Sequence, residues 1–113
     1  MDARLPTHVE VGALLRQVEA AGGFATVIAK GDRDSGTILV VLCHNGRDSR
    51  AFERMPQADG TRRWACSRRQ DSENPWEFAE YLDRRKAQDS DLWIIELDIA
   101  DGERFIGLSD STG

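Results

Sequence analysis

The first pattern of apolar and polar positions along the chain has the period of an α-helix. Its apolar side chains recur every three or four residues, at Val11, Leu14, Leu15, Val18 and Ala21. This spacing places them on one stripe of a helix, with polar side chains elsewhere. Thr7 followed by Glu10 has the form of a capping box, and Gly22-Gly23 supplies the residue of positive φ that ends many helices. The pattern predicts a helix from about residue 8 to residue 21.

Beyond this helix the pattern changes to short apolar and β-branched runs, which predict strands. Residues 24–30 form one such run, and residues 37–44 form a second that is apolar at both alternating sets of positions. A run of the second kind is typical of a central strand that is covered on both faces. We therefore expect two strands separated by a polar loop, residues 31–36.

Two turn signals follow and predict a pair of hairpins. Asn45-Gly46 favours a type I′ turn, which needs positive φ at both central residues, and Asp59-Gly60 favours a second tight turn. The runs next to these turns, residues 49–55 and 61–67, predict two further strands. Together with residues 37–44 they would form an antiparallel meander.

The last third of the chain predicts a second helix and a buried strand. Asn74-Pro75-Trp76-Glu77 combines an N-cap residue, a proline and a glutamate in helix-start order, so we expect a helix over residues 75–88. The mostly apolar residues 92–99 predict a strand in the interior of the sheet, and residues 105–108 predict a short edge strand. Residues 109–113 are polar, and we expect a disordered tail there.

These elements predict an α+β fold in the order α-β-β-β-β-α-β. We expect a mainly antiparallel twisted sheet of about five strands, with two helices on one face. A length of 113 residues suits a single domain, which we place at residues 1–108. The predicted core consists of Leu14, Leu15, Val18, Phe24, Ile28, Leu39, Val41, Phe78, Leu82, Trp93, Ile95 and Leu97.

The composition, 40% hydrophobic and 31% charged, is that of a globular protein. No apolar run approaches the roughly 20 residues of a membrane-spanning helix, and the first residues carry no secretory signal. We therefore expect a cytoplasmic protein without a membrane partner.

Cys43 and Cys66 are the only cysteines, and they fall on predicted strands that a third strand separates. Two inter-strand spacings amount to about 9–10 Å, which exceeds the Cα separation of roughly 7 Å that a disulfide tolerates. We predict two free thiols. His8 and His44 share no ligand spacing with a cysteine pair, so neither a metal site nor a cofactor is predicted.

Charge is unevenly distributed along the chain. The formal net charge is −5, yet residues 47–69 carry seven arginines against three carboxylates, a local +4 that leaves −9 for the rest. The acidic balance argues against non-specific binding to nucleic acid or anionic membranes by the molecule as a whole. The segregation of charge makes the predicted arginine-rich hairpin the main candidate site.

The arginines of this hairpin are candidate anion ligands, because a guanidinium group binds phosphate bidentately. The candidates are Arg50, Arg54, Arg62, Arg63 and Arg69, and Trp64 is a candidate for stacking on a base. A two-residue turn between the strands would place Arg63 on the side of Arg50 and Arg54. Arg62 would then share the opposite side with Trp64. The alternative is a solvated sheet face whose arginines pair with carboxylates elsewhere, while Trp64 packs under a helix.

Two acidic features allow further interpretations. Asp32 and Asp34, in the loop after the first strand, suggest a metal loop or an Asp-x-Asp phosphotransfer site. The alternative is a hairpin loop whose aspartates cap backbone N–H groups. Glu96 interrupts an apolar strand and invites a general acid–base role, but no partner for it can be placed from the sequence. No catalytic residue is therefore predicted.

Several of these patterns together resemble one known family. They are the opening segment RLPTHVEVGALLRQVEAAGGFATVIAKGDRDSGTILV and the late segment DSDLWIIELD. Their most distinctive pieces are Gly22-Gly23-Phe24-Ala25, the glycine-bounded loop 31–36, and Asp91-Leu92-Trp93 with Glu96. Over residues 3–100 the chain resembles the bacterial family known as domain of unknown function 1491. The resemblance implies a small stand-alone domain and no activity, cofactor or functional residue.

The sequence favours a small non-enzymatic accessory or protein-interaction module, whose partner is another protein or a second copy of the chain. A compact domain with two charge poles and no recognisable catalytic constellation supports this interpretation. The alternative is anion or nucleic-acid binding through the arginine-rich hairpin, residues 47–69. A more remote alternative is a hydrolase-like enzyme that uses Glu96.

Overall fold

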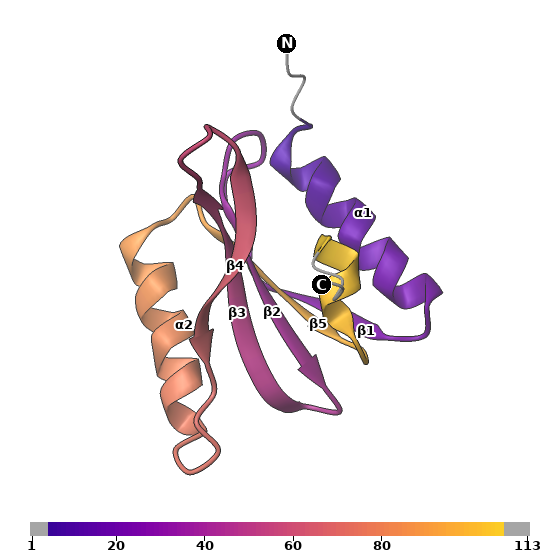
Figure 1. Cartoon of the computed structure of the whole chain (residues 1–113), viewed down its shortest axis with the longest axis vertical. Helices are drawn as coiled ribbons and strands as arrows, with labels where there is room; N and C mark the ends of the chain where they lie inside the picture. Colours follow the sequence, from indigo (N-terminus) through magenta and orange to yellow (C-terminus); the bar gives the residue numbers. More distant parts are fainter. Residues whose placement is uncertain (1–4, 108–113) are drawn as a thin grey trace.

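A computed structural model describes residues 5–107 and shows a five-stranded sheet with helices beside it (Figure 1). In chain order the elements are α1 (Thr7–Ala20), β1 (Phe24–Ala29), β2 (Ile38–His44), β3 (Arg47–Pro56), β4 (Arg62–Arg69), α2 (Trp76–Gln88), β5 (Trp93–Asp98) and a 3-10 helix, η1 (Gly102–Ile106). The α+β class, the two helices and the five strands are confirmed. Neither helix of the described chain is long and apolar enough to cross a membrane. The tail at residues 109–113 lies outside the described residues.

The strands lie in the order β1-β5-β2-β3-β4. β2, β3 and β4 form the predicted antiparallel meander, and Asn45 and Gly46 take positive φ values of 55° and 72°. β5 inserts between β1 and β2, antiparallel to β1 and parallel to β2, so the sheet is mixed. The interior position expected for β5 is confirmed, whereas β1 lies at the edge of the sheet.

Both faces of the sheet are covered, because β2 and β5 bury both of their alternating sets of side chains. The cluster under α1 consists of Val11, Leu14, Val18, Ile38, Val40, Leu42, Phe52, Trp93, Ile95, Leu97 and Ile106. The cluster under α2 consists of Ala29, Leu39, Val41, Ala51, Phe78, Leu82, Leu92 and Ile94. The expectation that both helices lie on one face is therefore wrong: α1 and α2 lie on opposite sides of the sheet (Figure 1). Two helices on one face would leave the other apolar face of β2 and β5 in water.

The two ends of α1 are capped by different means. At its C-terminus Gly22 takes a φ of 93°, and the Gly23 N–H donates to the Val18 carbonyl oxygen at 2.9 Å, as in a Schellman motif. At its N-terminus no side chain caps the helix, and the Thr7 hydroxyl instead donates to the Gly36 carbonyl oxygen at 2.7 Å. The prediction of a capping box is therefore wrong. Carbonyl groups of the loop before β2 accept the first N–H groups of the helix in its place.

Most of the predicted core is buried, with two exceptions on β1. Phe24 is 75% exposed and Ile28 is 38% exposed, because β1 is an edge strand with a neighbour on one side only. Leu15 is partly buried against the cluster under α1. The edge strand expected over residues 105–108 is also wrong, since the chain up to Ile106 forms η1. Ile106 is buried in the cluster under α1, which explains its apolar character.

Candidate functional site

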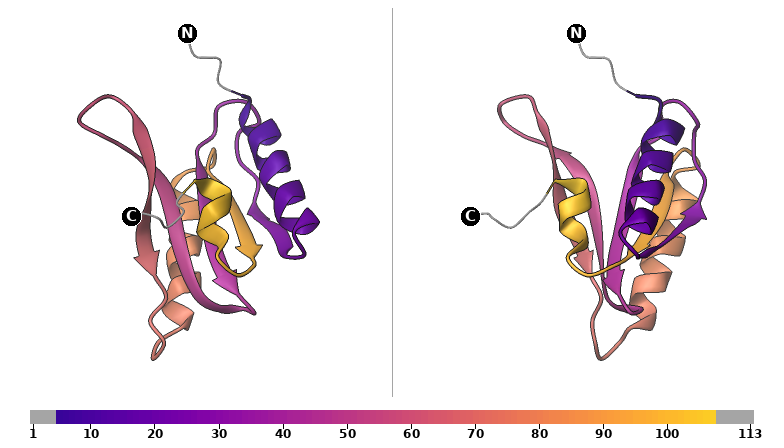
Figure 2. Two further views of the ribbon diagram at one scale, coloured as in Figure 1. Left: turned by 45° about the vertical axis from the view of Figure 1, so that its right-hand side comes forward. Right: turned by 90° about the vertical axis from the view of Figure 1, so that its right-hand side faces the viewer.

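The arginine-rich hairpin of β3 and β4 stands at one side of the molecule, and its far end projects beyond the other strands (Figure 2). The turn at Asp59-Gly60 is longer than expected. The Gln57 N–H donates to the Thr61 carbonyl oxygen at 2.7 Å, which leaves a three-residue loop between the two strands. The third residue shifts the register of the hairpin by one position.

This shift changes which arginines share a side of the hairpin. Arg54 pairs with Trp64, and Met55 pairs with Arg63. Because paired residues point to the same face, Arg62 and Trp64 lie on the side of Arg54, and Arg63 lies on the opposite side. The expected grouping of Arg63 with Arg54 is therefore wrong, since it assumed a two-residue turn.

On the side that faces α1, carboxylates of the same chain hold two arginines of β3. Arg54 forms an ion pair with Glu10 of α1, and its guanidinium carbon lies 4.7 Å from the centroid of the half-buried Trp64 ring. Arg50 forms an ion pair with Glu103 of η1. Burial opposes ionisation of Glu103, but the hydrogen bonds from Arg50 and its own backbone hold the pKa of Glu103 below its ordinary value. Arg50 and Arg54 are therefore both engaged in ion pairs inside the fold.

The arginines of β4 are exposed. They are Arg62 and Arg63 at one end of the strand and Arg68 and Arg69 at the other, with Trp64-Ala65-Cys66-Ser67 between them. Within residues 5–107 none of the four forms an ion pair. The guanidinium carbon of Arg68 lies 4.9 Å from the centroid of the Tyr81 ring, on the side of α2. The positive charge of the hairpin is therefore carried mainly by its outer strand.

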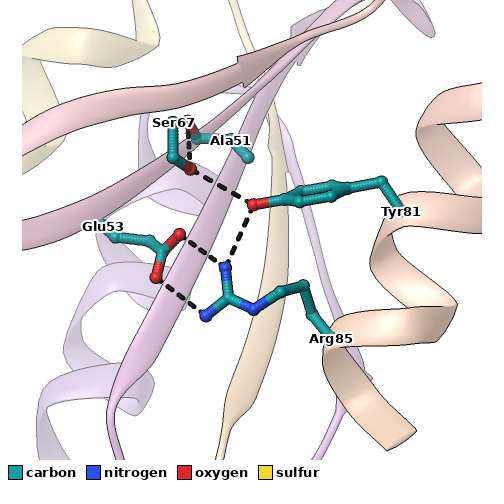
Figure 3. Close-up of polar contacts among 5 residues, drawn as sticks. All are labelled: Ala51, Glu53, Ser67, Tyr81 and Arg85. Carbon is teal, nitrogen blue, oxygen red and sulfur yellow. Dashed lines mark hydrogen bonds and ion pairs between the residues drawn. The ribbon is translucent and has the colours of Figure 1, made fainter. Parts of the chain in front are cut away.

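A polar network joins the other side of the hairpin to α2 (Figure 3). Arg85 of α2 donates to both carboxylate oxygens of Glu53 on β3, at 2.6 and 2.9 Å, and to the Tyr81 hydroxyl at 3.0 Å. The Ser67 hydroxyl of β4 lies 3.3 Å from the Tyr81 hydroxyl and 3.4 Å from the Ala51 carbonyl oxygen. Hydrogen bonds from Arg85 hold the pKa of Glu53 below its ordinary value, and Glu53 raises the pKa of Arg85.

The sequence pattern alone does not predict this network. The one signal for it is the four-residue spacing of Tyr81 and Arg85, which places both side chains on one face of a helix. Glu53 gives no signal, because its alignment with Arg85 depends on where α2 lies on the sheet.

A cleft of about 700 Å³ opens between the hairpin, the start of α1 and the loop before β2. Its lining residues are Leu5, Pro6, Thr7, Glu10, Asp34, Ser35, Gly36, Thr37, Ile38, Glu53, Arg54 and Arg62. Charges of both signs line the cleft, and Arg54 and Glu10 are paired with each other. Arg62 is the exposed cation of this lining, so it joins the cleft to the surface of β4.

A second group of titratable side chains lies where β2 and β5 end. The Asp98 carboxylate accepts hydrogen bonds from the backbone N–H groups of Asn45-Gly46 at 2.7 and 3.0 Å, and so caps that turn. Burial, together with the negative charges of Glu96 and Asp98, raises the pKa of the Cys43 thiol to about 12. A thiol of this kind stays protonated at neutral pH, and the thiolate is the nucleophilic form. The surroundings of Glu96 therefore hold no activated thiol.

Both cysteines are free, as predicted. β3 separates the strand of the buried Cys43 from the strand of the exposed Cys66. Among residues 5–107, no three His, Cys, Asp or Glu side chains gather in an arrangement suited to a metal ion.

Comparisons with known proteins decide the family. The family described as "Protein of unknown function (DUF1491)" matches residues 5–107, nearly the whole chain. The chain belongs to this family. The description of the family names no activity. No curated protein matches the chain.

Solved structures share this fold, and DUF1491 proteins are among them. The crystal structure of a DUF1491 protein from Caulobacter crescentus CB15 is 32% identical, with a TM-score of 0.77 over 92% of this chain and 96% of that one. An NMR structure of a DUF1491 protein from the same organism is 33% identical, with a TM-score of 0.76 over 94% and 96% of the two chains. The solution structure of protein Atu0922 from A. tumefaciens is 31% identical, with a TM-score of 0.73 over 96% and 97%.

In this DUF1491 chain, two of the segments that carry the resemblance meet each other. The Asp32 N–H donates to the Asp91 carbonyl oxygen at 3.0 Å, and the Trp93 indole N–H donates to the Asp32 carbonyl oxygen at 2.7 Å. Hydrogen bonds from the backbone and hydroxyl of Ser35, at 2.8 and 3.0 Å, lower the pKa of the Asp32 carboxyl. The interpretation of Asp32 as a local cap is confirmed. The loop does not close a hairpin, however, because β5 lies between β1 and β2.

Proposed function

We propose that this protein is a small interaction module that binds an extended acidic segment of a partner protein along the edge strand β4. The observation that carries the proposal is a strand edge, unpaired within residues 5–107, that bears four exposed arginines. An edge strand presents backbone N–H and C=O groups to an added strand, and this pairing supplies affinity in β-augmentation. Guanidinium groups at both ends of β4 would select a carboxylate-rich partner.

The distribution of side chains along β4 suits such a partner. Neighbouring residues of a strand point to opposite faces, so Arg62 and Arg63 serve different faces of the added strand, as do Arg68 and Arg69. Between the arginine pairs, Trp64 is half-buried against Arg54. Ala65, Cys66 and Ser67 are small and uncharged, which leaves room for the side chains of the partner. Carboxylates on either face of the added strand would therefore meet a guanidinium group.

The hairpin is also held in place before any partner arrives. Arg50 and Arg54 tie β3 to η1 and α1, and Glu53 and Ser67 tie both strands to α2. A surface that is already ordered loses less conformational entropy on binding. These internal contacts also mean that the four arginines of β4, and not Arg50 or Arg54, supply the charge for recognition.

Two observations favour a protein over a nucleic acid as the partner. One face of the Trp64 ring is covered by the guanidinium group of Arg54, so this ring is a poor platform for base stacking. The backbone groups of an edge strand pair with a peptide and have no counterpart in a nucleic acid.

We place the module in the cytoplasm, whose reducing conditions keep the exposed thiol of Cys66 free.

The test uses fluorescence anisotropy with a labelled peptide of about ten residues that alternates glutamate with valine. We expect saturable binding that weakens as salt is raised, because exposed charge pairs are screened. The variant Arg63→Glu combined with Arg68→Glu reverses two charges of β4 and should lower the affinity at least about tenfold.

Arg16→Glu combined with Arg84→Glu is the matched control, since both arginines are exposed on helices and the change in net charge is the same. This control should leave the affinity within about twofold of the unmodified protein. Equal losses in the two double variants would contradict a site on β4. Tighter binding of an oligothymidylate than of the acidic peptide would replace the proposal with nucleic-acid recognition.

A further inference from the structure

The opposite edge of the sheet, β1, has a different chemical character from β4. Its sequence is Phe-Ala-Thr-Val-Ile-Ala, with no charged side chain, in a chain that is 31% charged. Phe24 is 75% exposed, Val27 39% and Ile28 38%, and they are among the largest exposed apolar side chains of the described residues. Within residues 5–107 no strand pairs with the outer side of β1.

Soluble proteins usually protect a sheet edge with charged side chains, because an uncharged edge with apolar side chains pairs with another strand. β4 has this protection in its four arginines, which would oppose one another if two β4 strands met. β1 has none. Its side chains also differ from those of β4 in lacking any charge that would select an acidic or a basic partner.

We infer that β1 binds a second copy of this chain, by antiparallel pairing of two β1 strands about a two-fold axis. An antiparallel pair of identical strands is self-complementary, and two uncharged strands meet without like-charge repulsion. The two sheets would join into one continuous sheet, with the two β4 edges at its far ends. The surface that recognises a partner under the proposed function is therefore separate from the surface that joins the copies.

The bulge in β1 limits the register of this pairing. The ladder with β5 is irregular between Val27 and Ala29, so regular pairing with a second copy is confined to the first part of β1. A two-fold axis at Ala25 places Phe24 opposite Thr26 of the second copy, twice in the dimer. Aromatic and β-branched side chains opposite one another stabilise a strand pair. The pairing would also cover Phe24, the most exposed of these apolar side chains.

The residues of β5 that pair with Phe24 and Thr26 allow a double variant that should disrupt the dimer and keep the fold. Phe24 pairs with Asp98 of β5, and Thr26 pairs with Glu96. Lysine at both positions would thus face carboxylates within one chain, which favours the folded monomer. Across the two-fold axis the same lysines would face each other, as the arginines of two β4 strands would. Phe24→Lys combined with Thr26→Lys is therefore expected to separate the copies and keep the fold.

Analytical ultracentrifugation over a range of concentrations up to about 1 mM tests this inference. We expect the unmodified protein to change from monomer to dimer over this range, and the β1 double variant to raise the dissociation constant at least about tenfold. Ala79→Lys combined with Ala87→Lys adds the same charge at exposed positions of α2 and should leave the dissociation constant within about twofold. Amide exchange is the second measurement, because amides of residues 24–27 should gain protection as the concentration of the unmodified protein rises.

Three results would overturn the inference. They are a monomer throughout the concentration range, a dimer that persists in the β1 double variant, and equal loss of the dimer in the α2 control. The acidic-peptide titration separates the two proposals, since the β1 double variant should bind the peptide through β4 as the unmodified protein does.

Discussion

Two glycines of the loop before β2 stand where the backbone of another segment passes. A Cβ atom added to Gly31 or Gly36 would lie 2.2 Å from the carbonyl oxygen of Asp91, which precedes β5. Real Cβ atoms do not approach a backbone oxygen this closely, so both positions need glycine for a steric reason. The Gly36 carbonyl oxygen also accepts the Thr7 hydroxyl. The loop before β2 therefore contacts both α1 and the segment that leads into β5, and so holds α1, β2 and β5 together.

The substitution Gly36→Ala tests this junction. It should lower the free energy of unfolding by about 3 kcal/mol, because the backbone of the loop or of Asp91 must move. Gly12→Ala is the control: its Cβ would meet only the flexible end of Arg16, at 3.3 Å, and it should stabilise α1 by up to about 1 kcal/mol. Urea denaturation of both variants is the measurement. An unchanged midpoint for Gly36→Ala would contradict the close packing of this loop on β5.

At the scale of elements, α2 is attached to the sheet by a small apolar contact and a polar one. Phe78 and Leu82 are its buried residues, and Arg85 reaches across to the carboxylate of Glu53 on β3. The side chains of Arg85 and Glu53 are 26% and 20% exposed, so solvent screens this ion pair only in part. The pair therefore contributes to the position of α2 and, through Tyr81 and Ser67, to the position of β4.

The ion pair predicts how stability depends on pH. The pKa of Glu53 is lower in the folded protein than its ordinary value of 4.5, so the unfolded chain binds the proton more readily. The contribution of the ion pair to stability is fully present at pH values above the ordinary pKa of Glu53. It is lost as the pH falls through the lower pKa that Glu53 has in the folded protein. Glu53→Gln should cost about 1 kcal/mol at pH 7 and progressively less below pH 4.5. Urea denaturation at several pH values measures this difference, and a cost that does not shrink in acid would contradict an ionic role for Glu53.

At the scale of the whole molecule, the acidic and basic parts are joined by ion pairs. Arg54 reaches Glu10 on α1, and Arg50 reaches Glu103 on η1, so carboxylates of two other elements hold the basic hairpin. Partly exposed pairs of this kind contribute only about 0–1 kcal/mol each to the stability of the fold. Their effect is therefore expected in the local motion of the hairpin and less in global unfolding.

The double variant Glu10→Gln with Glu103→Gln tests this separation of local from global effects. We expect amide exchange to accelerate several-fold in β3 and β4, while the free energy of unfolding falls by no more than about 2 kcal/mol. Glu19→Gln with Glu77→Gln removes the same charge from exposed positions of α1 and α2, and serves as the control. Hydrogen exchange followed by mass spectrometry resolves the two strands. Acceleration spread evenly over all strands would contradict a local tie.

The candidate site was predictable in part. The high density of arginine between residues 47 and 69 identifies the hairpin and its charge. It does not tell Arg54, which is held by Glu10, from Arg62, which is exposed, because both are ordinary arginines of predicted strands. That difference arises from one extra residue in the turn and from the position of α1. Both are properties of the assembled fold.

The sequence by itself determined the helices, the strands and the separation of the two cysteines, because these depend on the period of neighbouring side chains and on turn chemistry. Only the tertiary structure decided that β5 enters between β1 and β2, that the helices cover opposite faces, and that β1 and β4 form the two edges. The physical reason is that periodicity is a local property of the chain. The choice of strand neighbour and of sheet face depends on burying apolar surface between segments that lie far apart in the sequence.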